Sequence, residues 1–250
     1  MRAGILPRNH RRQTGVAQYS KAGAIQPTNM RTWIKFCGTT SLTDALASVQ
    51  AGADALGFIF APSKRQVTPD AVREIIMGLS AGIERIGVFM DEKLDAVRKI
   101  AELAALTGVQ LHGKESTEFV ARLKAELVGG RSLRVIKTVI MNGDFHLQLE
   151  KFITASSPPD AILLDSGAGS GRTFDWRGVR SFLTGTEMKF IVAGGLNAEN
   201  VSTAMRMFHP YGVDVVSGVE SSPGKKDPEK LNAFVAAVRN AEKEAWAAQH

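Results

Sequence analysis

Short apolar runs alternate with amphipathic segments along the chain from Trp33 onward. The apolar runs are rich in β-branched residues and contain few polar positions, a pattern typical of parallel strands that are buried on both faces. This pattern predicts strands at residues 33–36, 55–60, 85–89, 108–111, 133–137, 161–164, 189–193 and 213–216.

The segments between and after these runs carry apolar residues at helical spacing and open with residues that commonly cap helices. Ser41 precedes Asp44 by three positions, Thr68 precedes a proline, and Asn197 and Asp227 each stand before a helical segment. The predicted helices cover residues 41–50, a segment that begins at Thr68, and residues 91–106, 116–127, 144–153, 174–183, 197–208 and 227–246.

Eight strands that alternate with eight helices through short connections predict an α/β protein with a (β/α)8, or TIM, barrel. A chain of 250 residues with 44% hydrophobic content can fill one such domain, which we expect to span residues 31–250. A doubly wound open sheet is the alternative fold, but such sheets usually have fewer strands.

Residues 1–30 differ from the rest of the chain. They hold five basic residues and no acidic residue, so they account for +5 of the formal charge of +6. They also lack hydrophobic periodicity, which predicts a disordered basic extension. Because the remaining chain is nearly neutral, we expect no nucleic-acid partner. An organelle transit peptide and a true start at Met30 are both left open as explanations of this segment.

The chain has a single cysteine, Cys37, which excludes an intrachain disulfide framework and indicates a reducing, cytoplasmic location. No apolar run approaches the roughly 18 residues of a membrane helix, so no membrane association is expected. No cluster of histidine, cysteine or acidic residues has the spacing of metal ligands, and we predict no metal site.

In barrels of parallel strands the chemistry takes place at the carboxyl ends of the strands. Cys37, His112 and Asp165 directly follow predicted strands, Lys137 ends the fifth, and Arg65 lies in the loop after the second. A free cysteine is usually buried packing and an arginine is usually solvated, so each assignment is weak by itself. Their shared position makes Cys37 and Asp165 candidates for an acid–base pair on opposite sides of the barrel mouth.

Two glycine-containing loops predict a phosphate site. Gly194 and Gly195 follow the seventh predicted strand, and Ser217 and Gly218 follow the eighth. Glycines allow backbone N–H groups to point at an anion, and a helix N-terminus adds partial positive charge. A single glycine pair is more often a tight turn than a ligand site. Here both loops stand after strands seven and eight, which is the recurring phosphate site of this fold.

A third glycine-rich segment, residues 167–173, follows Asp165. Such a segment can close as a lid and exclude water from a catalytic group. We therefore expect a lid beside Asp165, where a water-free environment suits general-acid chemistry.

Several motifs, taken in order, resemble the phosphoribosylanthranilate isomerases of tryptophan biosynthesis. They are Lys35-Phe36-Cys37-Gly38-Thr39-Thr40, Gly57-Phe58-Ile59-Phe60, Ser63-Lys64-Arg65-Gln66-Val67, Val109-Gln110-Leu111-His112-Gly113, Leu164-Asp165-Ser166, Gly169-Ser170-Gly171, Phe174-Asp175-Trp176, Gly194-Gly195-Leu196, Asp214, Ser217-Gly218-Val219-Glu220 and Pro223-Gly224-Lys225-Lys226-Asp227. The resemblance extends from about Ile34 to the end of the last predicted helix.

The resemblance implies an Amadori rearrangement, without a cofactor, of N-(5-phosphoribosyl)anthranilate to 1-(2-carboxyphenylamino)-1-deoxyribulose 5-phosphate. This reaction is an aldose–ketose isomerisation. The resemblance implies that Cys37 is the general base and Asp165 the general acid, and that Arg65 binds the anthranilate carboxylate through a two-pronged contact. His112 and Asp214 are implied as further substrate-binding residues, although Asp214 lies within the last strand and has a structural role as its alternative. The expected state is a monomer or a homodimer.

Three other functions are left open. The histidine-pathway isomerase performs the same rearrangement on a related phosphoribosyl compound, but it is expected to use two aspartates and no cysteine. A Schiff-base aldolase would use Lys137 as its amine. A non-catalytic phosphate-binding barrel would keep the fold and lose the chemistry.

Overall fold

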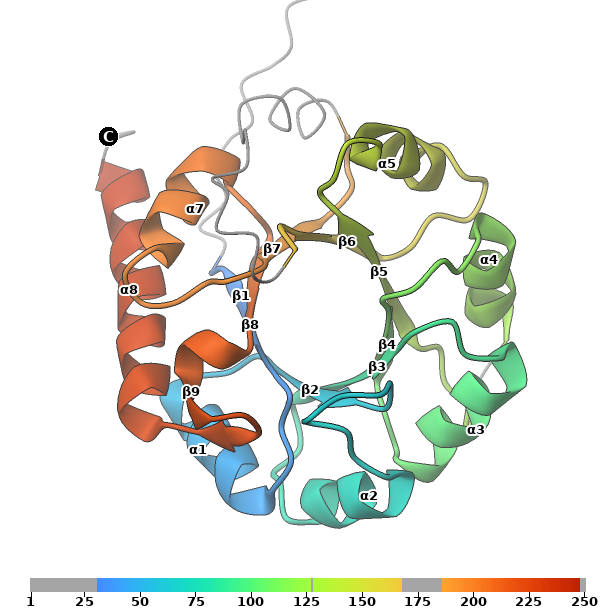
Figure 1. Cartoon of the computed structure of the whole chain (residues 1–250), viewed down its shortest axis with the longest axis horizontal. Helices are drawn as coiled ribbons and strands as arrows, with labels where there is room; N and C mark the ends of the chain where they lie inside the picture. Colours follow the sequence, from blue (N-terminus) through green and yellow to red (C-terminus); the bar gives the residue numbers. More distant parts are fainter. Residues whose placement is uncertain (1–30, 127, 168–185, 248–250) are drawn as a thin grey trace, which may run out of the picture. The chain divides into compact units, whose positions relative to one another are not determined.

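The computed structural model describes residues 31–126, 128–167 and 186–247. Within these ranges eight parallel strands close into a barrel in chain order, with β1 also paired to β8 (Figure 1). The strands are β1 Trp33–Cys37, β2 Ala55–Ile59, β3 Glu84–Phe89, β4 Gly108–Leu111, β5 Arg134–Ile140, β6 Ala161–Asp165, β7 Phe190–Ala193 and β8 Gly212–Val215. The predicted (β/α)8 barrel is confirmed.

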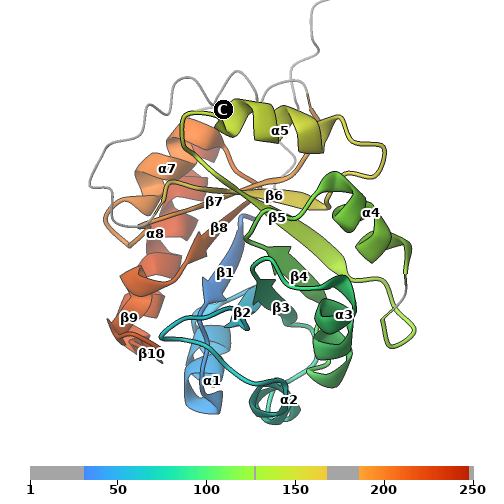
Figure 2. The same ribbon diagram turned by 45° about the vertical axis from the view of Figure 1, so that its right-hand side comes forward.

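Helices surround the barrel on its outside (Figures 1 and 2). Those in the described ranges are α1 Leu42–Ala51, α2 Pro69–Met77, α3 Leu94–Leu103, α4 Thr117–Ala125, α5 Phe145–Ile153, α7 Val201–Phe208 and α8 Pro228–Ala247. After β8 come a 3₁₀ turn, η1 Ser217–Val219, and a hairpin of β9 Glu220–Ser222 and β10 Lys225–Lys226. The predicted extension at residues 1–30, most of the predicted lid and the predicted helix at 174–183 lie outside the described residues.

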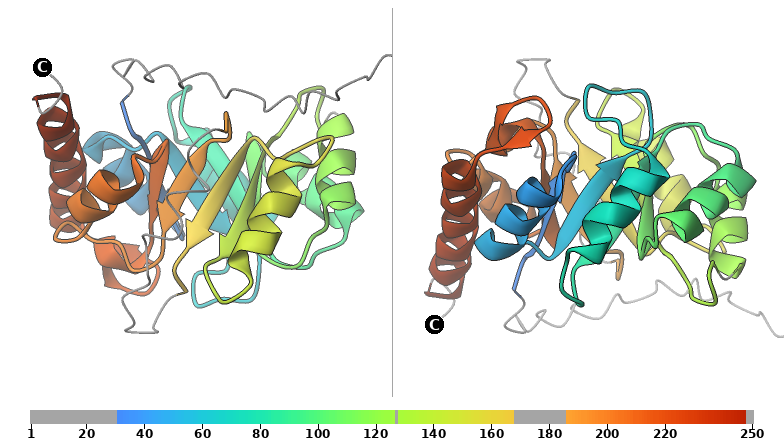
Figure 3. Two further views of the ribbon diagram at one scale, coloured as in Figure 1. Left: turned by 90° about the horizontal axis from the view of Figure 1, so that it is seen from above. Right: turned by 90° about the horizontal axis from the view of Figure 1, so that it is seen from below.

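Side chains alternate between the two faces of the barrel wall, as a strand requires. In β1, Ile34 and Phe36 belong to the apolar layer between strands and helices, whereas Trp33 belongs to a separate cluster inside the barrel. Lys35 and Cys37 share the inward face with Trp33. Figure 3 shows the strands between the flanking helices in two further views. The apolar cluster inside the barrel consists of Trp33, Ala55, Ile86, Ile136, Ala161, Leu163, Ile191 and Ala193.

Three of the predicted helix caps are confirmed. The Ser41 side chain accepts a hydrogen bond from the Asp44 N–H at 3.1 Å, and Thr68 accepts one from the Ala71 N–H at 3.3 Å. Asp227 precedes α8 and accepts a hydrogen bond from the Glu229 N–H at 3.0 Å. Each cap satisfies a backbone donor that has no partner inside the helix.

The prediction that Asn197 begins a helix is wrong, because α7 begins at Val201. The Asn197 side chain instead accepts hydrogen bonds from the backbone N–H groups of Glu199 and Asn200, both at 3.0 Å. Asparagine commonly closes such a turn on its own backbone. A turn therefore separates the end of β7 from α7.

The prediction that the fifth strand ends at Lys137 is also wrong, because β5 continues to Ile140. The added residues Thr138, Val139 and Ile140 are all β-branched, a side-chain type that favours strand conformation. Lys137 therefore lies inside the strand. Its neighbours of the same parity, Val135 and Val139, belong to the layer between strands and helices, so Lys137 faces away from the barrel interior.

Candidate active site

Cys37 ends β1 and is buried, with 3% of its surface exposed. Gly57 on β2 leaves room for the thiol, because a Cβ at residue 57 would lie 2.6 Å from the sulfur. Burial raises the pKa of Cys37 by disfavouring the thiolate, and the charge of Asp214 adds to this effect, while the ammonium groups of Lys35 and Lys226 oppose it. The free thiol is thus surrounded by charges of both signs.

Asp165 ends β6 and is half-buried. Its Oδ1 accepts a hydrogen bond from the Gly167 N–H at 2.9 Å, which fixes the carboxylate at the strand end. Asp165 has the same parity as Ala161 and Leu163, which lie inside the barrel. In the closed barrel β7 and β8 separate β6 from β1, so Asp165 and Cys37 reach the same mouth from different sides.

His112 follows β4, and its Nδ1 lies 3.3 Å from Gln110 Nε2. Burial lowers the pKa of His112, although the charges of Asp165 and Asp214 act in the opposite direction. His112 has the same parity as Gln110, which meets Lys35 inside the barrel. This places His112 at the same mouth as Asp165.

Asp214 lies inside β8 and is 6% exposed. Its Oδ1 accepts a hydrogen bond from Lys35 Nζ at 2.9 Å, and Lys35 also donates to Gln110 Oε1 at 2.8 Å. Gln110 in turn donates to Thr138 Oγ1 at 3.1 Å. These side chains form a polar layer across the barrel. Its members Lys35 and Gln110 were not among the predicted site residues, although a lysine in the apolar run 33–37, two positions before Cys37, is a signal for an inward-facing charge.

Arg65, in the loop after β2, forms a two-pronged ion pair with Glu220 of β9. Its Nε donates to Glu220 Oε1 at 2.8 Å and its Nη2 donates to Oε2 at 2.6 Å. Lys226 Nζ lies 3.3 Å from Glu220 Oε1 and donates to the Cys37 carbonyl at 2.6 Å. Although burial favours the protonated acid, Arg65 and Lys226 lower the pKa of Glu220. Glu220 therefore joins the loop that carries Arg65 to the hairpin beside Cys37.

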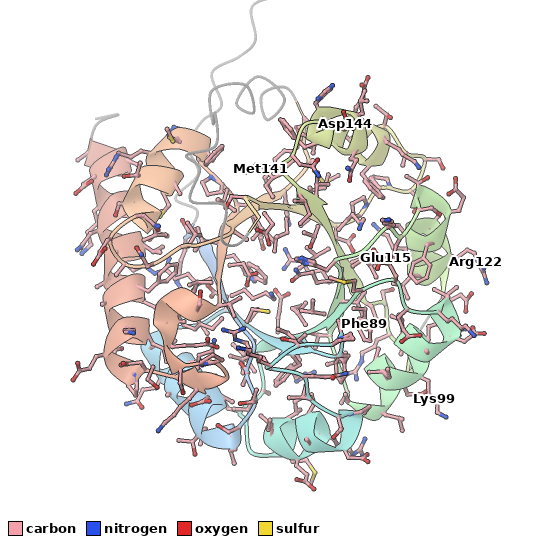
Figure 4. All side chains as sticks on the ribbon, viewed as in Figure 1. Phe89, Lys99, Glu115, Arg122, Met141 and Asp144 are labelled. Atoms are coloured by element: carbon pink, nitrogen blue, oxygen red, sulfur yellow. The ribbon has the colours of Figure 1, made fainter. Side chains whose placement is uncertain are left out.

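Lys137 lies apart from this mouth. Its Nζ donates to the Gly113 carbonyl at 2.6 Å and to Glu115 Oε2 at 2.9 Å, and both side chains are 2% exposed. Figure 4 shows Glu115 beside β4 and β5. Burial lowers the pKa of Lys137, although the Glu115 carboxylate acts against it. The pair fixes the loop after β4, and the lysine faces away from the barrel interior.

The two loops predicted to bind phosphate lie against each other. A Cβ at Gly218 would collide with the Leu196 carbonyl, so the loop after β8 packs directly on the loop after β7. Gly194 and Gly195 adopt positive φ angles of 91° and 66°, and neither donates a backbone hydrogen bond to another described residue. Asn200 Nδ2 holds the Gly195 carbonyl at 2.9 Å. Ser217 begins η1 beside them.

No group of three or more histidine, cysteine or acidic side chains within residues 31–126, 128–167 and 186–247 is arranged to hold a metal ion. In the same part of the chain, no helix has the length and apolar character needed to span a bilayer.

Comparison with known proteins gives a consistent family. The sequence model described as N-(5'phosphoribosyl)anthranilate (PRA) isomerase matches residues 34–237. The N-(5'-phosphoribosyl)anthranilate isomerase of Pelobacter propionicus is 40% identical over 205 residues, which are 81% of this chain and 93% of that protein. The Bacillus cereus enzyme of the same name is also 40% identical, over 84% of this chain and 100% of that protein.

Solved structures agree with the sequence comparison. The phosphoribosyl anthranilate isomerase of Thermotoga maritima superposes with a TM-score of 0.74 at 36% identity and covers 84% of this chain and 99% of its own. A phosphoribosyl anthranilate isomerase in complex with reduced 1-(o-carboxyphenylamino)-1-deoxyribulose 5-phosphate superposes with a TM-score of 0.71 at 35% identity, over 84% of this chain and 99% of that chain.

Proposed function

Because the chain belongs to the N-(5'-phosphoribosyl)anthranilate isomerase family, we propose that its barrel mouth carries out the Amadori rearrangement with Cys37 as base and Asp165 as acid. The observation that carries this assignment is the placement of Cys37 and Asp165 on inward-facing strand ends, on different sides of one mouth. The activity is that of an isomerase, an intramolecular oxidoreductase that converts an aldose derivative into a ketose derivative.

Asp165 donates a proton to the ring oxygen of the ribose, and the nitrogen lone pair opens the ring to a protonated Schiff base. The positive nitrogen makes the C2–H acidic, so a base of modest strength is sufficient. The Cys37 thiolate removes this proton. The electron pair of the broken C2–H bond forms the C1–C2 double bond of an enaminol, and the pair of the C1–N double bond returns to nitrogen. Protonation at C1 and loss of the proton of the 2-hydroxyl group then give the ketone, and the reaction is an isomerisation without net loss of atoms.

The other predicted residues bind the substrate in this proposal. Arg65 uses its Nε and Nη2 for Glu220, and its Nη1 makes no hydrogen bond to the residues that the structure describes, so one arm faces the anthranilate carboxylate. The neutral His112 lies against the sugar. Asp214 is engaged with Lys35, which supports its structural alternative as much as a contact with a sugar hydroxyl. The paired loops at Gly194, Gly195, Ser217 and Gly218 hold the phosphate.

The proposal also covers setting and assembly. A free, buried Cys37 is suited to a reducing cytoplasm. The state is a monomer or a homodimer, which light scattering of the purified chain would decide.

The test is a fluorescence assay of the full chain with freshly made phosphoribosylanthranilate. We expect saturable consumption of substrate and formation of the carboxyphenylamino-deoxyribulose phosphate. The Asp165→Asn variant should lose at least about a hundredfold in kcat, because an amide cannot donate the proton. A wild-type chain without turnover would contradict the function, and an active Asp165→Asn variant would contradict the role of the acid.

A further inference from the structure

Lys35 stands in the middle of an apolar strand and is completely buried. A charge in such a place is stable only when partners compensate the loss of water. Two partners are present, because Nζ donates to Asp214 at 2.9 Å and to Gln110 at 2.8 Å. Burial alone would lower the pKa of Lys35, but the charges of Asp214 and Cys37 outweigh it and raise that pKa. The side chain is therefore an ammonium ion held by two contacts.

Lys35 and the thiol of Cys37 occupy adjacent inward-facing positions of β1. Lys35 and Cys37 are two residues apart on β1, so both side chains point into the barrel on adjacent levels. An ammonium has three donors, of which Asp214 and Gln110 take two. The third N–H of the ammonium is therefore available to the sulfur of Cys37. Lys35 is thus the cation that the strand itself fixes beside Cys37.

Four charged groups from different elements act on the thiol. Lys35 comes from β1, Asp214 from β8 and Lys226 from β10, and the Arg65 guanidinium faces Cys37 from the loop after β2. Lys226 and Arg65 share the single negative charge of Glu220, and Lys35 is paired with Asp214. Asp214 repels a thiolate. Lys35 has the strongest opposing effect to burial among the groups that favour the thiolate.

If the ion pair between Lys35 and Asp214 were purely structural, its removal would leave the pKa of the Cys37 thiol unchanged. An apolar pair of similar volume would serve the same packing purpose, because buried ion pairs are seldom more stable than well-packed apolar side chains. The Lys137–Glu115 pair shows such a structural role, because it fixes a loop and has no part in the surroundings of Cys37. The position of Lys35 next to Cys37 on the inward face of β1 is what distinguishes the two pairs.

We propose that Lys35 is a positioning residue of the isomerase, whose ammonium, held by Asp214 and Gln110, stabilises the Cys37 thiolate. This inference rests on the proposed role of Cys37 as base. Burial raises the pKa of Cys37 above its ordinary value even with the cation in place, so without Lys35 the thiolate would be scarcer still. The polar layer under the mouth then has a catalytic purpose, although none of its members needs to touch the substrate.

The test is a thiol titration of the full chain, followed by the ultraviolet absorbance of the thiolate. Cys37 is the only cysteine, and a Cys37→Ala chain supplies the baseline, so the signal reports one sulfur. The variant is Lys35→Met/Asp214→Asn, which removes the cation without leaving a buried carboxylate unpaired. The matched control is Lys137→Met/Glu115→Gln, which removes the other buried lysine–carboxylate pair. Circular dichroism confirms that both variants are folded.

We expect the pKa of Cys37 to rise by about one unit in the Lys35 variant, which is about a tenfold smaller thiolate fraction at neutral pH. The control should titrate like wild type. The acid limb of the pH profile of kcat/KM should move with the thiol in each variant.

Equal titration of wild type, the Lys35 variant and the control would overturn the proposal. The thiol titration needs no substrate, so it tests the effect of Lys35 on Cys37 separately from the proposed isomerase activity. A thiol that responds to Lys35 in a chain without isomerase turnover would support this inference and contradict the proposed function.

Discussion

Charged residues inside a parallel barrel need partners, and the partners decide what each charge does. Lys35 and Asp214 pair within the barrel below the mouth, whereas Lys137 and Glu115 pair outside the barrel wall. The sequence shows these residues as charges in or beside apolar runs, and the two-residue period predicts which face they take. The sequence does not show which charged residues form pairs. Lys35 and Asp214 are 179 positions apart and meet only because β1 pairs with β8 in the closed barrel.

The same limit applies to Arg65. Its place in a loop after β2 follows from the motif, but its ion pair with Glu220 spans 155 positions and depends on how the β9–β10 hairpin folds back. Glu220 itself lies in a motif that the sequence singles out, where its carboxylate could have been considered as a partner for a cation. The candidate site residues were thus predictable one by one, but the ion pairs that hold them, such as Arg65–Glu220, were not.

Replacement of Arg65 tests its contact with the substrate. In Arg65→Met we expect KM to rise by about 10- to 100-fold, the effect of losing a charged hydrogen bond, with a smaller change in kcat. Glu220 keeps Lys226 and the Gly224 N–H as partners, so the hairpin should stay in place. Steady-state kinetics with the substrate and with its analogue that lacks the carboxylate provide the check. If the variant still prefers the carboxylated substrate by the wild-type factor, Arg65 does not bind that group.

At the scale of elements, the existence of each barrel strand and each described α-helix follows from the apolar pattern, and the boundaries follow less well. The β9–β10 hairpin and the turn η1 were not predicted. The extension of β5 to Ile140 moves Lys137 from a strand end into the strand, and this removes the geometric basis for a Schiff-base lysine at the mouth. The turn at Asn197 delays α7 to Val201. Both differences arise where local side-chain preferences compete, so that spacing alone cannot choose between strand and loop, or between turn and helix.

The Lys137–Glu115 pair offers a test of how β5 supports the loop that carries His112. Lys137→Met leaves the Glu115 carboxylate buried without its cation, and we expect a loss of about 3–5 kcal/mol in the free energy of unfolding. Lys137→Met/Glu115→Gln should recover most of this loss, because it removes the buried charge and the amide oxygen still accepts from the Asp91 N–H group. Urea unfolding measures both. Equal stability of the two variants would show that the unpaired charge is not the cause.

At the scale of the whole molecule, the alternation of strands and helices was sufficient to predict a closed barrel, because eight such units have a single common architecture. The family model begins at residue 34, and the Bacillus cereus relative is covered over its full length by 84% of this chain. Every proposed site residue lies at or after Lys35. The proposed chemistry therefore belongs to the barrel.

Deletion of residues 1–29 tests this division. We expect the shortened chain, which begins at Met30, to keep kcat/KM within about twofold of the full chain, because surface changes away from the site have effects of this small size. The deletion lowers the formal net charge from +6 to +1. The fluorescence assay compares the two chains. A large loss of turnover in the shortened chain would assign the first residues a part in the site.

The central claim is that the Cys37 thiolate removes the proton from the sugar carbon, and one measurement tests it most directly. It is the turnover of phosphoribosylanthranilate by Cys37→Ala, measured beside the affinity of the same variant for a product analogue. We expect kcat to fall by at least about a hundredfold, the usual effect of removing a general base, while the affinity stays close to wild type. Turnover at the wild-type rate with alanine at residue 37 would contradict the account.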